Sequence, residues 1–321
     1  MGPKVSILIA SFNHEAYLPD CLASVVGQTF LEWEVILVDD LSQDSSWEMA
    51  QNWSLKDPRI KVFRNETNLG TYGTQQRALE QANGELVVVL NSDDYWDADK
   101  LILQVDAMQQ NPEASWCFCR AMSVGSLLPA EMPTSTWPTA GVFNAFPLLL
   151  PQNDVAASSV MFRKKGLRFN PDCRYSGDWL ALIEASLRGS AVAVPKVLSY
   201  WRQHNSNSYV RSASQLAEEI WLRREILKLA NAVKNFSPAL AECAMHLSAL
   251  QVLAGQLRKG RHYSWMALLL DPSLRTFKRW LATLLPLNGA MRRLWPGQTP
   301  IEIPGERPRR SVDWHALPAE K

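Results

Sequence analysis

Two pairs of acidic residues follow apolar runs, and they are the residues of this chain best placed to do chemistry. Asp93 and Asp94 follow the run 86–90, and Asp39 and Asp40 follow a second, shorter run. Continuous apolar runs of this length predict strands buried on both faces. Open α/β sheets bind ligands beyond the carboxyl ends of such strands, where paired carboxylates need a cation or hydrogen-bond donors. The pattern therefore predicts a divalent metal held against a diphosphate.

The elements that must position these acids alternate between strands and helices. We expect strands over 5–10, 35–38, 60–63, 86–90 and 115–119, helices over 15–26, 74–82 and 99–109, and another helix opened by a capping box of Ser45 and Glu48. A Pro-rich loop over 124–152 precedes a strand at 158–162, a helix at 178–187, a strand at 197–201 and helices beyond 212. This alternation predicts an α/β fold with a mostly parallel sheet.

Composition and charge restrict the class of protein. Hydrophobic residues make up 47% and charged residues 20% of the 321 residues, as in ordinary globular proteins. The five cysteines are odd in number and lack metal-site spacing, which favours reduced core thiols. The chain opens without an apolar signal segment and has no apolar run of membrane-spanning length, so we expect a cytoplasmic protein.

Two common phosphate-binding motifs are missing. Ala10-Ser11-Phe12-Asn13 stands after the first strand, where a dinucleotide site would have its Gly-x-Gly-x-x-Gly, and no Gly-x4-Gly-Lys-Ser/Thr loop occurs. A nucleotidyltransferase is disfavoured for a related reason, because it needs a glycine-rich basic loop at the same place. Phosphate charge must then be balanced by a metal rather than by a glycine-rich cradle.

Several segments in order resemble the family 2 glycosyltransferases. They are the opening strand Val5–Asn13, the segments 24–30 and 34–46, Asn68-Leu69-Gly70, Gly84-Glu85 and Asn91-Ser92-Asp93-Asp94. The resemblance covers roughly residues 4 to 210 and is closest to enzymes of bacterial cell-surface polysaccharide synthesis. It implies a GT-A fold with a Rossmann-like sheet, a nucleoside-diphosphate-sugar donor, a divalent metal and inversion at the anomeric carbon.

The resemblance also implies roles for individual residues. The donor nucleotide would be bound by Ser11, Asn13, Asp39, Asp93 and Arg202, and Mn²⁺ or Mg²⁺ by Asp93, Asp94 and His204. The chain departs from the family in two places: Asn91 replaces the first acid of the DxD motif, and Thr74-Gln75-Gln76 stands where Ala-Arg-Asn is frequent. The first departure leaves open which of Asp93 and Asp94 binds the metal directly.

The acceptor side of the site is expected around Asp178. Tyr175-Ser176-Gly177-Asp178-Trp179 resembles the family segment in which an acid opens a helix and acts as general base. The alternative is that Asp178 only caps that helix. Trp179 would stack on a sugar or pack in the core, and Ser159 lies in a segment that resembles the acceptor-side strand.

A basic C-terminal region follows the catalytic domain. We expect a catalytic domain over 1–210, with a nucleotide-sugar half over 1–120 and an acceptor half over 121–210, and a helical region over 211–321. Between residues 255 and 310, 11 Lys/Arg face 3 Asp/Glu, and a helix beginning at Asp271-Pro272 carries an apolar stripe, Leu274, Phe277, Leu281, Leu284 and Leu285. This favours docking of 264–310 on an anionic inner-leaflet membrane surface, although packing on the catalytic domain is the alternative. Nucleic acid is not expected as a partner.

The sequence thus predicts an inverting, metal-dependent glycosyltransferase that uses a nucleoside-diphosphate sugar, with UDP- or dTDP-linked donors favoured. The acceptor would be a hydroxyl of a glycan or lipid-linked molecule in cell-surface polysaccharide synthesis, reached from the cytoplasm or the inner membrane face. The alternative is a non-catalytic scaffold that binds nucleotide sugar or glycan within an assembly complex.

Overall fold

The computed structural model describes residues 2–125, 130–133, 137–204, 212–228 and 237–294, together with residues 298, 301 and 312. The chain forms two compact units. The first, called the sheet unit, comprises Met1–Ala145 and Asp154–Ser208, and the second, called the helical unit, comprises Phe146–Asn153 and Tyr209–Lys321. Each unit is described by itself.

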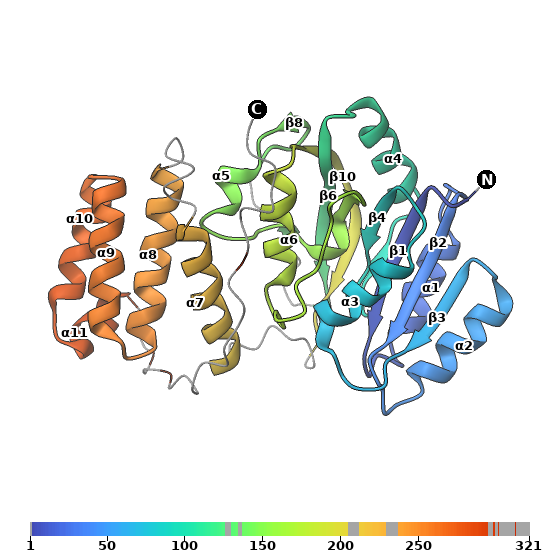
Figure 1. Ribbon diagram of the computed structural model, residues 1–321, viewed down its shortest axis with the longest axis horizontal. Helices are drawn as coiled ribbons and strands as arrows, with labels where there is room; N and C mark the ends of the chain where they lie inside the picture. Colours follow the sequence, from blue (N-terminus) through green and yellow to red (C-terminus); the bar gives the residue numbers. More distant parts are fainter. Residues whose placement is uncertain are drawn as a thin grey trace. The chain divides into compact units, whose positions relative to one another are not determined.

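The sheet unit is built on one large sheet (Figure 1). Its strands follow the order β3 (Ile60–Arg64), β2 (Trp33–Asp39), β1 (Val5–Ser11), β4 (Leu86–Val89), β9 (Val160–Arg163), β6 (Ala114–Val124), β10 (Ser190–Arg202) and β5 (Tyr95–Trp96), with β7 (Glu131–Met132) beside β6 and β8 (Gly141–Phe143) beside β10. The α/β class is confirmed. The sheet is mixed, however, because β9 runs antiparallel to both of its neighbours, whereas β1 to β4 are parallel.

Helices cover both faces of this sheet. α1 (Leu18–Val26), α2 (Ser46–Lys56) and α4 (Lys100–Gln110) share one hydrophobic core with alternate residues of β1 and β2. α3 (Gly70–Gln81) contacts β1 and β2, and α6 (Gly177–Ser186) contacts β6. Every residue of β2 is buried, which explains why this strand reads as a continuous apolar run rather than as an alternating one.

Helix capping differs from the expected pattern. The Ser45–Glu48 capping box does not form, because Ser45 makes no side-chain cap bond; Asp44 Oδ1 instead accepts from Ser46 N at 3.0 Å. The carboxylate of Asp40 serves a different helix, accepting from the first amides of α3, Leu69 N and Gly70 N, at 2.8 and 2.9 Å. Several short polar side chains can bind the free amides at the start of a helix. The one that lies closest in the folded chain forms the bond.

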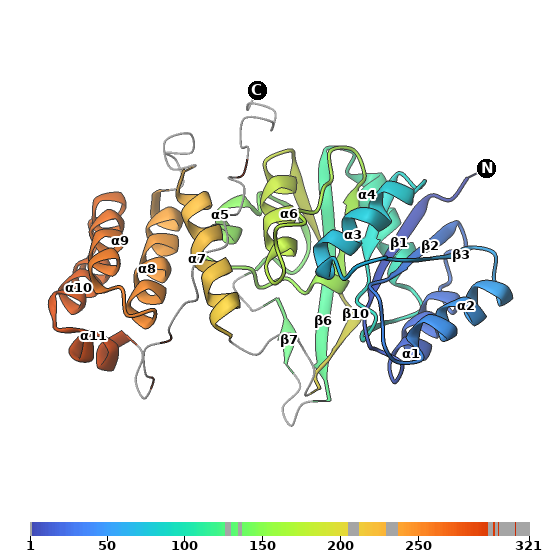
Figure 2. The same cartoon turned by 60° about the horizontal axis from the view of Figure 1, so that its bottom comes forward.

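The helical unit contains α5 (Phe146–Leu149), α7 (Ala213–Lys228), α8 (Ser237–Leu253), α9 (Leu257–Leu270), α10 (Leu274–Leu284) and α11 (Leu287–Leu294). α7, α8, α9 and α10 lie side by side in both views (Figures 1 and 2), and α8, which is buried along most of its length, supplies much of the core. Within the ranges described above, no helix is both long and apolar enough to cross a bilayer.

α10 has its large apolar side chains on the outside. It is capped by Ser273, whose side chain forms a capping box with Thr276, so the expected start at Pro272 is two residues early. The residues it buries are small or polar: Thr276, Ala282 and Thr283. Its exposed large side chains are Leu274 at 66%, Phe277 at 42%, Leu281 at 42% and Leu284 at 46%. The helix is therefore amphipathic, but its apolar face is turned to solvent.

Candidate active site

The loops that follow β1, β2, β4 and β10 meet at one edge of the sheet. Ser11 O accepts from Asp40 N at 2.8 Å, and the Asn13 side chain accepts from Gln43 N at 2.8 Å. Asp94 accepts from Arg202 N at 3.0 Å. The predicted donor and metal residues from these four loops are therefore neighbours, although Asp94 and Arg202, for example, are 108 positions apart in the chain.

Asp39 and Ser11 present unsatisfied polar atoms at this edge. Asp39 is fully buried, and its Oδ1 accepts from Ser42 N and pairs with Arg64 Nε, both at 3.1 Å. Among the described residues, neither Asp39 Oδ2 nor the hydroxyl of Ser11 has a hydrogen-bond partner. Buried polar atoms without partners are costly. Their arrangement suits a ligand that brings hydrogen-bond donors to this edge.

Three side chains gather into a cluster suited to a cation. His14, Asp93 and His204 each offer one ligand atom, and these atoms all lie within 4.8 Å of one another. His204 Nε2 lies 3.1 Å from Asp93 Oδ2, and the ring of Tyr17 stacks on His204 with centroids 4.4 Å apart. Imidazole and carboxylate are both common ligands of divalent transition metals, so the residues present fit a divalent cation.

His14 is held by a neighbour in the Asn91–Asp94 segment. Its Nδ1 lies 2.7 Å from the hydroxyl of Ser92, and that hydroxyl also donates to Ala10 O at 3.1 Å. Burial lowers the pKa of His14 below its ordinary value, with Asp93 acting in the opposite direction. The imidazole is therefore biased toward its neutral form, which is the form that binds metals.

Asp94 belongs to the protein scaffold rather than to this cluster. It is buried, and its two oxygens accept from the Ser158 hydroxyl, from Asn91 Nδ2 at 3.2 Å and from Arg202 N. Burial, and next the neighbouring Asp93, raises the pKa of Asp94 to about 7. Because protein donors already occupy its oxygens, we do not carry Asp94 forward as a metal ligand. His14, which the sequence did not predict, lies in the cluster with Asp93 and His204.

Asp178 lies in the first turn of α6 and is held by Tyr72. The phenol of Tyr72 donates to Asp178 Oδ1 at 2.9 Å. A side chain on the preceding Gly177 would overlap the Tyr72 ring, so glycine is needed there for this approach. The residue in the N-cap position is Ser176, so Asp178 is not the N-cap. An acid in the first helical turn is favoured in its ionised form by the helix dipole.

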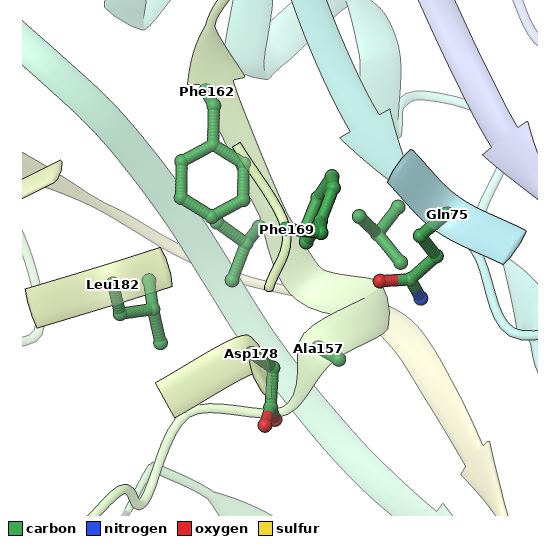
Figure 3. A pocket seen from close by; sticks show the side chains of 8 residues that line it. Gln75, Ala157, Phe162, Phe169, Asp178 and Leu182 are labelled. Carbon is green, nitrogen blue, oxygen red and sulfur yellow. The ribbon is translucent and has the colours of Figure 1, made fainter. Parts of the chain in front are cut away.

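A small apolar cavity lies beside Asp178 (Figure 3). It is lined by Gln75, Val89, Ala157, Val160, Phe162, Phe169, Asp178 and Leu182. Figure 3 shows the Asp178 carboxylate turned away from the rings of Phe162 and Phe169. Val89 is the last residue of β4, so the cavity lies near the segment that carries Asp93.

The remaining predicted residues have mainly structural contacts. Trp179 is 5% exposed and packs in the core, and Ser159 is fully buried with its hydroxyl donating to Ala156 O. Neither side chain is exposed to an acceptor, so we do not propose either as an acceptor-binding residue. The guanidinium of Arg202 pairs with Asp20 at 3.1 Å and lies over the ring of Tyr17.

Sequence reasoning missed three residues of this region. His14 stands just beyond the first strand, the same kind of position that drew attention to Asp39, so its place at a strand end was a usable signal. Tyr72 and Gln75 lie within a helix and carry no such signal. They are recognised only because α3 packs close to the start of α6.

Curated relatives match part of the chain. The putative teichuronic acid biosynthesis glycosyltransferase TuaG of Bacillus subtilis is 39% identical over 108 residues, covering 34% of this chain and 43% of TuaG. The UDP-Glc:alpha-D-GlcNAc-diphosphoundecaprenol beta-1,3-glucosyltransferase WfgD of Escherichia coli is 37% identical over 107 residues, covering 33% of this chain and 42% of WfgD. The matched region spans less than half the length of either relative.

Solved structures support the fold over a longer region, and a family model identifies the family. S. aureus TarS 1–349 superimposes with a TM-score of 0.64 at 18% identity, covering 90% of this chain and 91% of that one. The same protein has been solved in complex with UDP, with a TM-score of 0.57. The model of glycosyl transferase family 2 matches residues 6–168, about half of the chain. This chain therefore belongs to glycosyltransferase family 2.

Proposed function

We propose that this protein transfers a sugar, with inversion, from a nucleoside-diphosphate sugar to a hydroxyl group of a glycan or lipid-linked acceptor in cell-surface polysaccharide synthesis. The observation that carries the proposal is the convergence at one sheet edge of the unsatisfied Asp39 and the cation-binding cluster, with Asp178 beside the end of β4. Together these supply a nucleotide contact, a place for charge neutralisation and a proton acceptor.

Asp178 is the proposed general base. The acceptor hydroxyl attacks the anomeric carbon and forms the new glycosidic bond, while the bond from that carbon to the diphosphate oxygen breaks. The proton of the hydroxyl passes to Asp178, and the electron pair of the broken bond leaves with the nucleoside diphosphate. Tyr72 orients the carboxylate through its hydrogen bond to Oδ1.

The donor nucleotide is proposed to be UDP or dTDP. Asp39 Oδ2 is a buried acceptor that has no partner among the described residues, and uracil and thymine both present an imino N–H that such an oxygen can bind. Ser11 and Asn13 lie beside it. WfgD is named as a UDP-glucose enzyme and TarS binds UDP, which supports the same assignment.

A divalent cation, Mn²⁺ or Mg²⁺, is proposed to be held by Asp93 and His204. When bound, it would neutralise the charge that develops on the departing diphosphate. The residues of the chain contribute in other ways: the stacked Tyr17 fixes the plane of His204, and Arg202 lies close enough to add positive charge at the same edge.

The helical unit is proposed to meet an anionic membrane surface on the cytoplasmic face. Seven large apolar side chains between residues 265 and 285 are exposed: Trp265, Leu269, Leu274, Phe277, Leu281, Leu284 and Leu285. Exposed basic residues, including Arg258, Lys259 and Lys278, accompany them. Apolar side chains combined with basic residues suit anionic lipid, and the acceptor of WfgD is named as a lipid diphosphate. Most of the predicted segment beyond residue 294 lies outside the described residues.

The decisive test replaces Asp178 by Asn and measures sugar transfer and donor hydrolysis with a panel of nucleotide sugars. A general base is worth roughly 10²- to 10⁴-fold in rate, so the turnover of Asp178→Asn should fall by at least ~100-fold with little change in donor affinity. Asp106→Asn, an exposed acid on α4, is the matched control. Full activity of Asp178→Asn would refute the role of the base. Donor binding with no turnover in the wild-type protein would favour the scaffold alternative.

A further inference from the structure

We propose that His14 is a third protein ligand of the cation, and that the resulting site of two imidazoles and one carboxylate prefers Mn²⁺ to Mg²⁺ and binds it without nucleotide. This inference rests on the proposed function for its biological meaning. The three ligands come from three separate loops: His14 follows β1, Asp93 follows β4 and His204 follows β10.

The hydrogen bonds of Ser92 set the tautomer of His14. A serine hydroxyl has one proton, and that of Ser92 is directed to Ala10 O. Its oxygen is then an acceptor for His14, so His14 Nδ1 carries the proton in that 2.7 Å contact. In the neutral ring the other nitrogen, Nε2, must hold a free electron pair. Histidines that bind metals are commonly oriented by a hydrogen bond on the opposite ring nitrogen.

The separations within the cluster match those of ligands around one ion. Bonds of roughly 2.0–2.2 Å to a central metal place neighbouring ligand atoms about 3 Å apart and opposite ones about 4.4 Å apart. The 3.1 Å separation of His204 Nε2 and Asp93 Oδ2 is that of neighbouring ligands, and all three ligand atoms lie within 4.8 Å. Little movement is therefore required to close the site on an ion.

The chemical types of the three ligand atoms determine which metal ion the site prefers. Mg²⁺ favours carboxylate, carbonyl and water oxygens, and it gives up its water reluctantly. Imidazole nitrogens bind later first-row ions more strongly, and Mn²⁺ accepts both kinds of ligand. With two nitrogens and a single carboxylate, the cluster offers Mg²⁺ only one of its preferred ligands. The position of Asp94 strengthens this preference, because its carboxylate is occupied by Ser158, Asn91 and Arg202.

Binding of Mn²⁺ to the metal-stripped protein, without nucleotide, tests the inference. The free Mn²⁺ signal in electron paramagnetic resonance should fall as protein is added, and Mg²⁺ should displace the bound ion only in at least ~100-fold excess. Pulsed measurements should detect two coupled imidazole nitrogens in the wild-type protein and one in His14→Ala. Displacement by equal concentrations of Mg²⁺, or an unchanged nitrogen signal in His14→Ala, would overturn the inference.

Matched variants separate ligation from folding. His14→Ala should weaken Mn²⁺ binding by about 100-fold and Ser92→Ala, which leaves the imidazole but removes its orienting partner, by about 10-fold. His262→Ala, which removes an exposed histidine of α9, should bind as the wild-type protein does. Thermal unfolding of each metal-free variant checks its fold. If a variant is unfolded, the nitrogen count and the Mg²⁺ competition in the wild-type protein still decide.

The outcomes distinguish this inference from the proposed function. Sugar transfer in the presence of Mn²⁺, without Mn²⁺ binding to the protein alone, would retain the transferase and refute the preformed site. Mn²⁺ binding through both histidines, with neither nucleotide binding nor transfer, would retain the site and refute the transferase.

Discussion

Two elements, β2 of the sheet unit and α10 of the helical unit, place their apolar side chains in opposite ways. In the sheet unit the central strands are buried, and β2 has no exposed residue. In the helical unit α10 buries threonine and alanine and exposes leucine and phenylalanine. A continuous apolar run thus lies in the core of one unit, whereas an apolar stripe at helical spacing lies on the surface of the other. The apolar pattern of a sequence predicts that a helix or strand has an apolar face. Whether that face is buried depends on the elements that pack beside it.

The largest expected effect contrasts the same substitution in the two units. Leu22→Ala removes a fully buried side chain of α1 and should lower the free energy of unfolding by about 2–5 kcal/mol. Leu274→Ala, at a position 66% exposed on α10, should change it by less than about 0.5 kcal/mol. Denaturant unfolding followed by circular dichroism measures both. A large loss for Leu274→Ala would mean that the outer face of α10 is covered in solution.

A second prediction tests what the exposed face of α10 is for. Leu274→Glu combined with Leu281→Glu should reduce binding to phosphatidylglycerol-containing vesicles by at least ~10-fold, because it removes apolar contact and adds repulsion. Leu55→Glu, at a leucine 85% exposed on α2, is the matched control and should leave binding unchanged. Sedimentation with vesicles measures both variants. Equal binding to neutral vesicles would argue against the role of the basic residues.

A third prediction concerns the hydrogen bond between Tyr72 and Asp178 in the sheet unit. Tyr72→Phe keeps the ring against Gly177 but removes the hydrogen bond to Asp178. Bonds to charged groups contribute about 1.5–3 kcal/mol, so turnover should fall by roughly 10- to 150-fold. Steady-state kinetics of Tyr72→Phe and the wild-type protein measures the effect, and unchanged turnover would contradict this role.

The last prediction concerns stability and pH. The pKa of Asp94 is raised to about 7 in the folded chain, by burial first and by Asp93 second, from an ordinary value of ~3.9. Between these values the folded state keeps a proton that the unfolded state has lost. Raising the pH from about 4 to 7 therefore lowers the free energy of unfolding, by at most about 1.4 kcal/mol per pH unit.

Asp94→Asn should remove this component, since Asn does not titrate. The measurement is the difference in unfolding free energy between metal-free wild-type protein and Asp94→Asn at pH 5 and pH 7.5, in which other titrating groups cancel. Parallel pH dependence of the two proteins would show that Asp94 is already ionised at pH 5.

Local patterns predict the centre of the fold well. The runs at the second and fourth strands are apolar without interruption, and that of the first strand is interrupted only by Ser6. Such runs are typical of strands covered on both faces, and each forms a strand at the expected place. The strand expected at 158–162 begins later, at Val160. Ser159 lies in a short 3₁₀ turn that precedes β9. Sequence patterns do not show where a strand ends against a turn.

The candidate site is predictable only in part. Asp39 and Asp93 follow strands, and the topology of parallel sheets brings such positions to one edge. The contacts that decide roles, however, join residues far apart: Tyr72 and Asp178 are separated by 106 positions, and Ser158 and Asp94 by 64. No local period encodes such pairs. The direction of the apolar face of α10 is hidden for the same reason.

The apolar cavity beside Asp178 bears on inhibitor chemistry. Compounds that imitate a nucleoside diphosphate must carry charge, which hinders their passage through membranes. An uncharged compound that places a group of about methyl size among Val160, Phe162 and Leu182 would gain about 25 cal/mol for each Å² of apolar surface removed from water. Such a group would also lie beside the carboxylate on which turnover is proposed to depend. The cavity is therefore a contact point for inhibitors that do not imitate the diphosphate.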